Sequence, residues 1–248
     1  RSQVGNIVSS MTNNAAFNCI ATRAIITWKQ WPERETFLSN IESLLARQPQ
    51  RKAYYPGAHD RYERFTGMNP AQAKTLLKQN LDSGMCGRST VTDGPTMFVA
   101  GTGCKDDTLP GTLISNVQKD DQSNPLLCSE SFVSVCVEIP IDADNPIDFL
   151  HKATDFANQQ LWGTLAASMT VPKGFKRERR SAAALYECIH RLEYGVVSQN
   201  QWAGIAFALM SPPWGGYPGS SLSDIRSGTV WVHNSYMLTG IEKTVLEA

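Results

Sequence analysis

The chain has 248 residues, of which 42% are hydrophobic and 19% are charged. This share of apolar residues can bury a large core, which excludes global disorder, and the length fits one large domain or two small ones. The 23 basic and 23 acidic residues cancel to a formal net charge of zero, so no overall electrostatic field favours nucleic acid as a partner.

The first part of the chain alternates helix and strand patterns. Apolar residues at helical spacing predict a helix over 4–17, and the β-rich run at 20–28 predicts a strand. Pro32 and Pro70 each indicate the first turn of a further helix, because proline is well tolerated there. The stretch at 82–95 is rich in glycine, threonine and aspartate, which predicts a loop.

The rest of the chain continues this alternation. Apolar spacing predicts helices over 146–161 and 175–193, and β-rich runs predict strands at 96–100, 112–115, 132–139, 164–171, 195–199 and 229–233. Strands that alternate with crossover helices indicate an α/β fold of three layers with a mostly parallel sheet. No apolar run reaches the roughly 18 residues of a membrane span, and no glycine-rich phosphate-binding motif follows a strand.

The cysteines are sparse. None forms a C-x-x-C pair, and no histidine lies at metal-ligand spacing from them, so we expect neither a disulfide scaffold nor a metal site. Reduced thiols predict a cytoplasmic protein. The six positions are Cys19, Cys86, Cys104, Cys128, Cys136 and Cys188.

Cys19 stands where the predicted first helix gives way to the predicted first strand. A thiol at such a junction can receive backbone N–H groups and the neighbouring Asn18 amide, which would lower its pKa and place donors around an oxyanion. The alternative is a small buried hydrophobe, which is the usual state of a free cysteine. For Cys128, Cys136 and Cys188, the pattern favours core packing.

The segment N-x-x-x-N-C-x-A-x-R, which runs from Asn14 to Arg23, resembles the nucleophile segment of the aldehyde dehydrogenase superfamily. It departs from the family pattern at Phe17-Asn18, where glycine and glutamine are usual, and its Cys-to-Arg interval is one residue short. These departures indicate a divergent branch. Five further segments resemble family motifs in the same order, namely 108–114, 129–135, 161–168, 213–217 and 242–245.

The resemblance implies that residues 1–248 are the catalytic domain of an NAD(P)-dependent aldehyde dehydrogenase. In that family the thiolate at the position of Cys19 attacks an aldehyde, and the thiohemiacetal is oxidised to a thioester. The NAD or NADP cofactor would be bound mainly by a dinucleotide-binding domain that this chain lacks, so we expect the chain alone to be inactive. The longer parent is expected to be a homo-oligomer.

Further positions carry family roles by the same resemblance. Glu130 matches the residue that accepts the nicotinamide-ribose hydroxyls, and Phe132 matches the ring beside the nicotinamide. Trp202, Phe207 and Trp214 correspond to the wall of the substrate entrance and would suit an apolar aldehyde. Ordinary core packing is the alternative for all four aromatic side chains.

The sequence leaves several alternatives open. The same cysteine chemistry could transfer the acyl group to coenzyme A or reduce an acyl thioester. The domain could also be an inactive interaction or scaffold piece. His233 could in principle pair with a cysteine as in a hydrolase, and the basic run 176–180 could bind nucleic acid, although a solvated helix face is favoured.

Overall fold

The computed structural model describes residues 2–82, 88–89, 94–103, 105, 107–120 and 123–247. Most of the predicted loop at 82–95 lies outside these residues, as do Cys86 and Cys104. The chain divides into two compact units, a first unit of Arg1–Asp142 and a second unit of Ala143–Ala248.

The first unit is built on a sheet with the strand order β1 (Ala24–Trp28), β7 (Val135–Ile141), β6 (Gly111–Ser115), β4 (Thr96–Ala100) and β3 (Arg88–Ser89). The first three strands are parallel, whereas β4 is antiparallel to β6 and β3 is antiparallel to β4. All residues of β6 and nearly all of β7 are buried. Strands buried on both faces read as continuous apolar runs, which explains why the sequence pattern located them.

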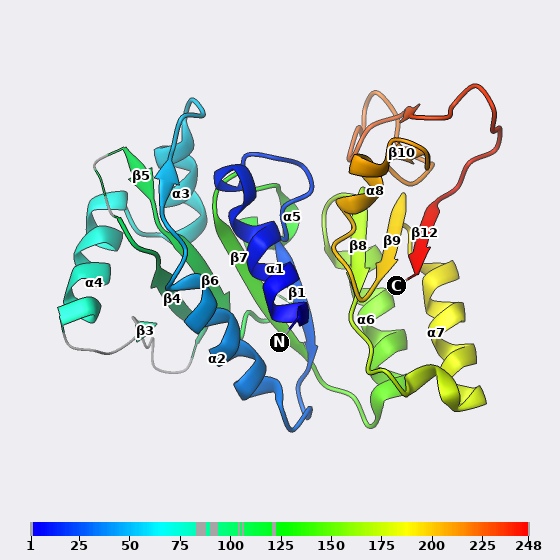
Figure 1. Ribbon diagram of the computed structural model, residues 1–248, viewed down its shortest axis with the longest axis horizontal. Coiled ribbons are helices and arrows are strands. Elements are labelled where there is room, and N and C mark those ends of the chain that lie inside the picture. Colours follow the sequence, from blue (N-terminus) through cyan, green and yellow to red (C-terminus); the bar gives the residue numbers. More distant parts are fainter. Residues whose placement is uncertain are drawn as a thin grey trace. The chain divides into compact units, whose positions relative to one another are not determined.

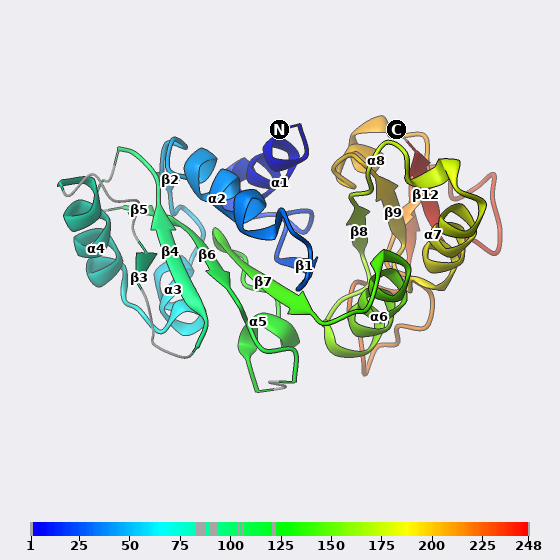
Figure 2. The same cartoon turned by 90° about the horizontal axis from the view of Figure 1, so that it is seen from below.

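Helices cover both faces of this sheet, as Figures 1 and 2 show. α1 (Ser2–Thr12) and α2 (Arg34–Leu45) lie on one face, and α3 (Ala58–Thr66) and α5 (Pro125–Cys128) lie on the other. α4 (Pro70–Asp82) lies beside the β4 end of the sheet. The first unit therefore has the three layers that the alternating pattern predicted.

The core of the first unit lies between the sheet and the two helices α1 and α2. Its members are almost fully buried and come from α1, α2, β1, β4, β6 and β7. A short antiparallel ribbon of β2 (Arg51–Lys52) and β5 (Thr108–Leu109) lies at the edge of this unit. The largest core side chains include Met11, Ile41, Leu45, Phe98 and Leu113.

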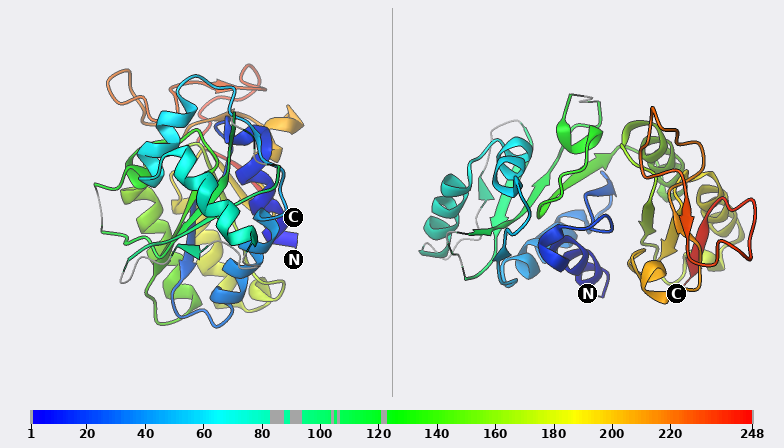
Figure 3. Two further views of the ribbon diagram at one scale, coloured as in Figure 1. Left: turned by 90° about the vertical axis from the view of Figure 1, so that its left-hand side faces the viewer. Right: turned by 90° about the horizontal axis from the view of Figure 1, so that it is seen from above.

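The second unit contains a parallel sheet of β8 (Ala166–Met169), β9 (Val196–Gln199) and β12 (Thr244–Glu247), in the order β12-β9-β8. α6 (Pro146–Gln160) and α7 (Arg179–Arg191) pack side by side against it (Figures 1 and 3). The smaller elements of this unit are η2 (Phe175–Arg177), α8 (Ile205–Leu209), β10 (Trp214–Gly215) and β11 (Trp231–Val232).

α6 begins where the sequence predicted it. Asn145 is its N-cap, and the Asn145 Oδ1 accepts hydrogen bonds from the N–H groups of Ile147 and Asp148, both at 3.0 Å. Pro146 occupies the first helical position, where its missing N–H costs nothing. The α/β fold class with a mostly parallel sheet is thus confirmed.

The expected first helix is too long, and one further helix was not predicted. The first helix ends at Thr12 rather than continuing to residue 17, because the next residues form a tight 3-10 turn, Asn13–Ala16. The helix α3 carries only Ala58, Tyr62 and Phe65 as buried residues, too few apolar positions for the pattern to stand out. In the described part of the chain, no helix is long and apolar enough to cross a membrane.

Candidate active site around Cys19

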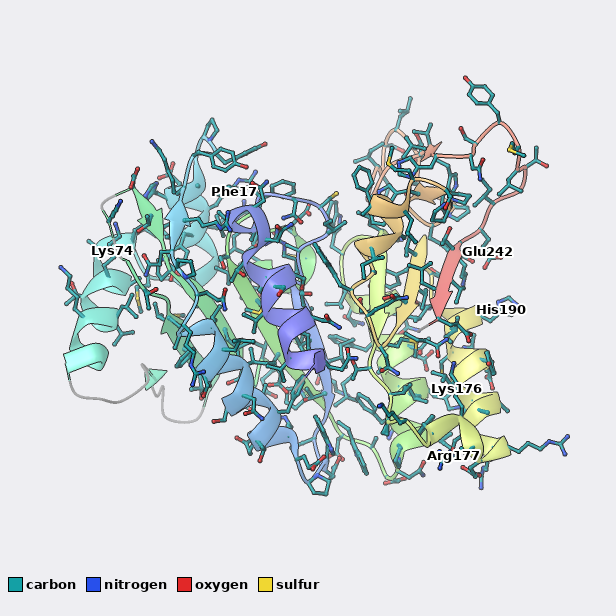
Figure 4. The ribbon with its side chains drawn as sticks, viewed as in Figure 1. Phe17, Lys74, Lys176, Arg177, His190 and Glu242 are labelled. Atoms are coloured by element: carbon teal, nitrogen blue, oxygen red, sulfur yellow. The ribbon has the colours of Figure 1, made fainter. Side chains whose placement is uncertain are left out.

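Three consecutive left-handed residues form the turn that leads to Cys19. Asn14, Ala15 and Ala16 have φ angles of 53°, 55° and 64°. Residues with a β-carbon rarely adopt this conformation, because the Cβ approaches the following carbonyl oxygen. The Phe17 N–H donates to the Asn14 carbonyl at 3.0 Å and closes the turn, and Figure 4 labels Phe17 at the end of this segment. Cys19 therefore follows a tightly folded, strained stretch of backbone.

The side chain of Asn18 holds the next part of the turn. Its Nδ2 donates to the Asn13 carbonyl at 2.9 Å, and its Oδ1 accepts from the Ile20 N–H at 3.1 Å. These bonds fix the backbone on both sides of Cys19. Asn18 was predicted to be a catalytic donor; its amide shapes the turn instead of standing free, and a direct catalytic role remains a prediction.

Cys19 is exposed, yet the pKa of its thiol is raised. Loss of water around the sulfur is the largest cause, and the Glu130 carboxylate adds to it, whereas the Cys19 backbone N–H and the Arg23 guanidinium oppose the rise. The sequence-based expectation of a lowered pKa is therefore wrong, because desolvation outweighs the donors. At neutral pH the thiol form predominates over the thiolate.

Arg23 joins the turn around Cys19 to the loop that precedes β7. Its Nη1 donates to the Val133 carbonyl at 2.6 Å, and its Nη2 donates to the carbonyls of Ala16 at 2.6 Å and Asn18 at 3.2 Å. Burial lowers the pKa of Arg23 to about 10, which still leaves the guanidinium charged at neutral pH. One buried cation therefore links two segments that are distant in the sequence.

Glu130 and Phe132 lie beside the same guanidinium. Burial raises the pKa of the Glu130 carboxyl, and Arg23 and Arg61 oppose that rise. The Arg61 Nη1 also donates to the Glu130 carbonyl at 3.4 Å. Phe132 has a left-handed φ of 49°, and its ring centroid lies 5.7 Å from the Arg23 Cζ. Thus Cys19, Glu130 and Phe132, three residues selected from the sequence, gather around Arg23.

A chain of aromatic rings borders this cluster. The Phe17 ring centroid lies 4.9 Å from that of Tyr54 and 5.7 Å from that of Tyr55, and the Tyr55 and Phe132 centroids are 5.9 Å apart. The Tyr54 hydroxyl donates to the Asn14 Oδ1 at 2.9 Å. Both tyrosines are about half exposed. Sequence reasoning missed them, although two adjacent tyrosines before Pro-Gly were a visible signal of a turn with aromatic side chains.

A small cavity lies behind Phe17 rather than at the thiol. Its volume is about 30 Å³, which is enough to hold water but not an aldehyde together with a nicotinamide ring. The Nε2 of Gln50, one of the lining residues, is buried without a hydrogen-bond partner. Neither Cys19 nor Glu130 lines this cavity, so it is separate from the cluster around Arg23.

The aromatic residues predicted for the substrate entrance lie in the second unit. The Phe207 ring centroid is 5.5 Å from that of Trp214 and 5.3 Å from that of His233. Trp214 is buried, Phe207 is half exposed, and Trp202 is partly buried just before α8. Cys19 belongs to the first unit. A substrate site that combines Cys19 with these three aromatic residues therefore remains a prediction.

The remaining described cysteines differ in access. Cys128 is exposed, so its predicted core position is wrong, and the reason is that α5 is a short surface helix. Cys136 is fully buried in β7, and burial raises its thiol pKa to about 12. Cys188 is also fully buried, with its Sγ 3.6 Å from the His151 Nδ1. Among the described residues, no group of histidine, cysteine and acidic side chains could hold a metal ion.

The basic run at 176–180 is exposed, as expected for a solvated face. Lys176 forms an ion pair with Glu247 at 3.2 Å and lies 5.6 Å from the centroid of the Tyr186 ring. Figure 4 labels Lys176 and Arg177 next to the beginning of α7.

The fold of the chain is the fold of aldehyde dehydrogenases. Aldehyde dehydrogenase 21 from Physcomitrella patens, in complex with the reaction product succinate, superposes with a TM-score of 0.56 at 13% identity. That match covers 95% of this chain and 44% of the Physcomitrella chain. The glyceraldehyde-3-phosphate dehydrogenase of Methanocaldococcus jannaschii, solved with NADP, gives 0.55 at 15% identity over 91% of this chain and 41% of its own.

A third solved structure shows the same likeness in fold. The salicylaldehyde dehydrogenase of Pseudomonas putida G7, complexed with salicylaldehyde, gives a TM-score of 0.54 at 17% identity, over 92% of this chain and 42% of its own. The chain thus spans less than half the length of these proteins. No family model matches the sequence, and no curated protein matches it.

Proposed function

We propose that the chain is the catalytic portion of an NAD(P)-dependent aldehyde dehydrogenase of the cytoplasm, with Cys19 as its nucleophile. The observation that carries this proposal is the cluster in which Cys19, Glu130 and Phe132 meet around one guanidinium. The aldehyde dehydrogenase fold supports it, and so do the free thiols, which are typical of a reducing compartment. The longer parent is proposed to be a homo-oligomer.

The proposed chemistry begins at the thiol. Once the thiol loses its proton to water, the Cys19 thiolate attacks the aldehyde carbon and the carbonyl electron pair moves to the oxygen. The Cys19 backbone N–H, which acts on the sulfur, is the proposed donor to that oxygen. Because the thiol pKa is raised, proton loss is the step that the surroundings must assist.

The residues beside the thiol fit the nicotinamide end of a dinucleotide. Glu130 offers a carboxylate that can accept hydrogen bonds from ribose hydroxyls, and Phe132 offers a partly exposed flat ring. When bound, NAD(P)⁺ supplies an acceptor for the hydride that leaves the aldehyde carbon. Trp202, Phe207 and Trp214 are the proposed wall for an apolar aldehyde.

The test is turnover of aldehydes with NAD⁺ or NADP⁺, measured on the longest natural polypeptide that contains these residues. C19S should reduce turnover on the order of a thousandfold, because a serine alkoxide is far harder to form than a thiolate. C128S, which alters another exposed cysteine, is the matched control and should leave turnover unchanged. Equal turnover in C19S and in the parent would overturn the proposal.

A second candidate function is an inactive domain that serves only in protein interaction. The raised pKa of Cys19 favours this alternative, because an activated nucleophile normally has a lowered pKa. Under this alternative, no aldehyde is turned over with either cofactor, and C19S behaves as the parent does.

A further inference from the structure

We propose that Arg23 is a positioning residue, which holds the Cys19 turn against the loop that carries Glu130. The inference builds on the function proposed above, because it concerns the same thiol. Its first support is geometric. The guanidinium donates to two carbonyls of the Cys19 turn, those of Ala16 and Asn18, and to the Val133 carbonyl of the other segment.

Each of the two segments that Arg23 joins contains strained backbone. Ala16 and Phe132 both have left-handed φ angles, of 64° and 49°. Such conformations are strained and persist only where surrounding contacts hold them. Since the Arg23 guanidinium binds the Ala16 carbonyl and lies over the Phe132 ring, loss of its fork geometry frees both strained segments.

The charges around Cys19 also depend on this clamp. Among the described residues, the charges of Glu130 and Arg23 act on the Cys19 thiol, and the charges of Arg23 and Arg61 act on Glu130. The Arg23 charge therefore acts to lower the pKa of two groups, the Cys19 thiol and the Glu130 carboxyl. Lysine at this position would keep the positive charge, but a single ammonium cannot reproduce the planar fork that reaches three carbonyls.

The experiment measures the rate at which iodoacetamide alkylates Cys19 in the folded chain, resolved by peptide mass, as a function of pH. In the parent chain, E130Q should speed this reaction about threefold near pH 8, because the repulsive carboxylate is gone. In R23K this effect of E130Q should disappear, since the two segments no longer face each other. R64K is the matched control, because Arg64 lies 5.7 Å from the Phe65 ring centroid on the exposed surface of α3.

Cys136 and Cys188 report on folding in the same samples, because both are buried and should stay unlabelled. An undiminished effect of E130Q in R23K, with both thiols still protected, would overturn the proposal. So would an E130Q variant that alkylates at the parent rate.

A second measurement needs no variant and covers the case in which R23K does not fold. Amide hydrogen exchange in the parent chain should show segments 13–20 and 130–134 opening with equal free energies, because one clamp holds both. Unequal opening would contradict the proposal. Neither measurement uses an aldehyde or a cofactor, so absence of turnover would overturn the proposed function alone.

Discussion

Two cysteines, one in each unit, show opposite combinations of the properties that a nucleophile needs. Cys188 in the second unit has a base nearby, since its Sγ lies 3.6 Å from the His151 Nδ1, but the residue has no exposed surface. Cys19 in the first unit is exposed, and its charged neighbours are Glu130 and Arg23 rather than a histidine. A Cys–His contact alone is thus no sign of catalysis, because access to the sulfur decides which thiol can meet a substrate.

The two sulfurs lie in different kinds of surroundings. Cys188 of α7 contacts His151 of α6, and His151 also contacts the Arg191 Nη1 at 3.2 Å. That cluster holds two helices together. The turn around Cys19 instead combines strained backbone with a buried guanidinium, which is the kind of arrangement found at functional sites.

The largest expected difference between the two cysteines is the access of a reagent to the sulfur. In the folded chain, Cys188 should react with iodoacetamide at least about a hundredfold more slowly than in urea, because the sulfur becomes available only through local unfolding. The rate at which Cys19 reacts should differ far less between the folded chain and the chain in urea. Site-resolved alkylation measures both thiols in one sample, and rapid labelling of Cys188 in the folded chain would remove the distinction.

The next effect is in pH dependence. Because the Cys19 thiol pKa is raised, the thiolate fraction at neutral pH is small and grows about tenfold for each pH unit below that pKa. Alkylation of Cys19 should therefore still be climbing at pH 9. A rate that levels off near pH 7 would show an activated thiolate and contradict the raised pKa.

The smallest effect is in stability. C188S should destabilise the fold by about 1–2 kcal/mol, because it places a hydroxyl among buried groups. C19S, at an exposed position, should change the free energy of unfolding by no more than about 0.5 kcal/mol. Urea unfolding monitored by circular dichroism measures both, and a larger loss for C19S than for C188S would assign Cys19 a structural role.

The sequence was informative where patterns are local. Capping and proline signals located the beginning of α6 at Pro146, and the continuous apolar run at 132–139 located β7. The left-handed turn could not be foreseen, because Ala15 and Ala16 carry no preference for positive φ. The motif pointed to Cys19 and Glu130, but the clamp between them joins Arg23 to residue 133, and no local pattern encodes such a contact.

The pKa of Cys19 shows a second kind of limit. Its direction depends on how much water the folded chain removes from the sulfur, and that quantity follows from packing of distant segments rather than from neighbouring residues. For the same reason Cys128, which sits in an apolar stretch of sequence, proved to be exposed.

The most direct test of Cys19 as the reacting thiol is acyl transfer from p-nitrophenyl acetate, which needs no cofactor. The folded chain is mixed with the ester at pH 8, quenched after one turnover equivalent, and digested to locate the acetyl group by mass. Among the described cysteines, Cys19 and Cys128 are exposed, and we expect acetyl on Cys19 first, because the Cys19 backbone N–H beside the sulfur can donate to the oxyanion. Acetyl on Cys128 first, or equal acetylation of both, would contradict the assignment of Cys19 as the nucleophile.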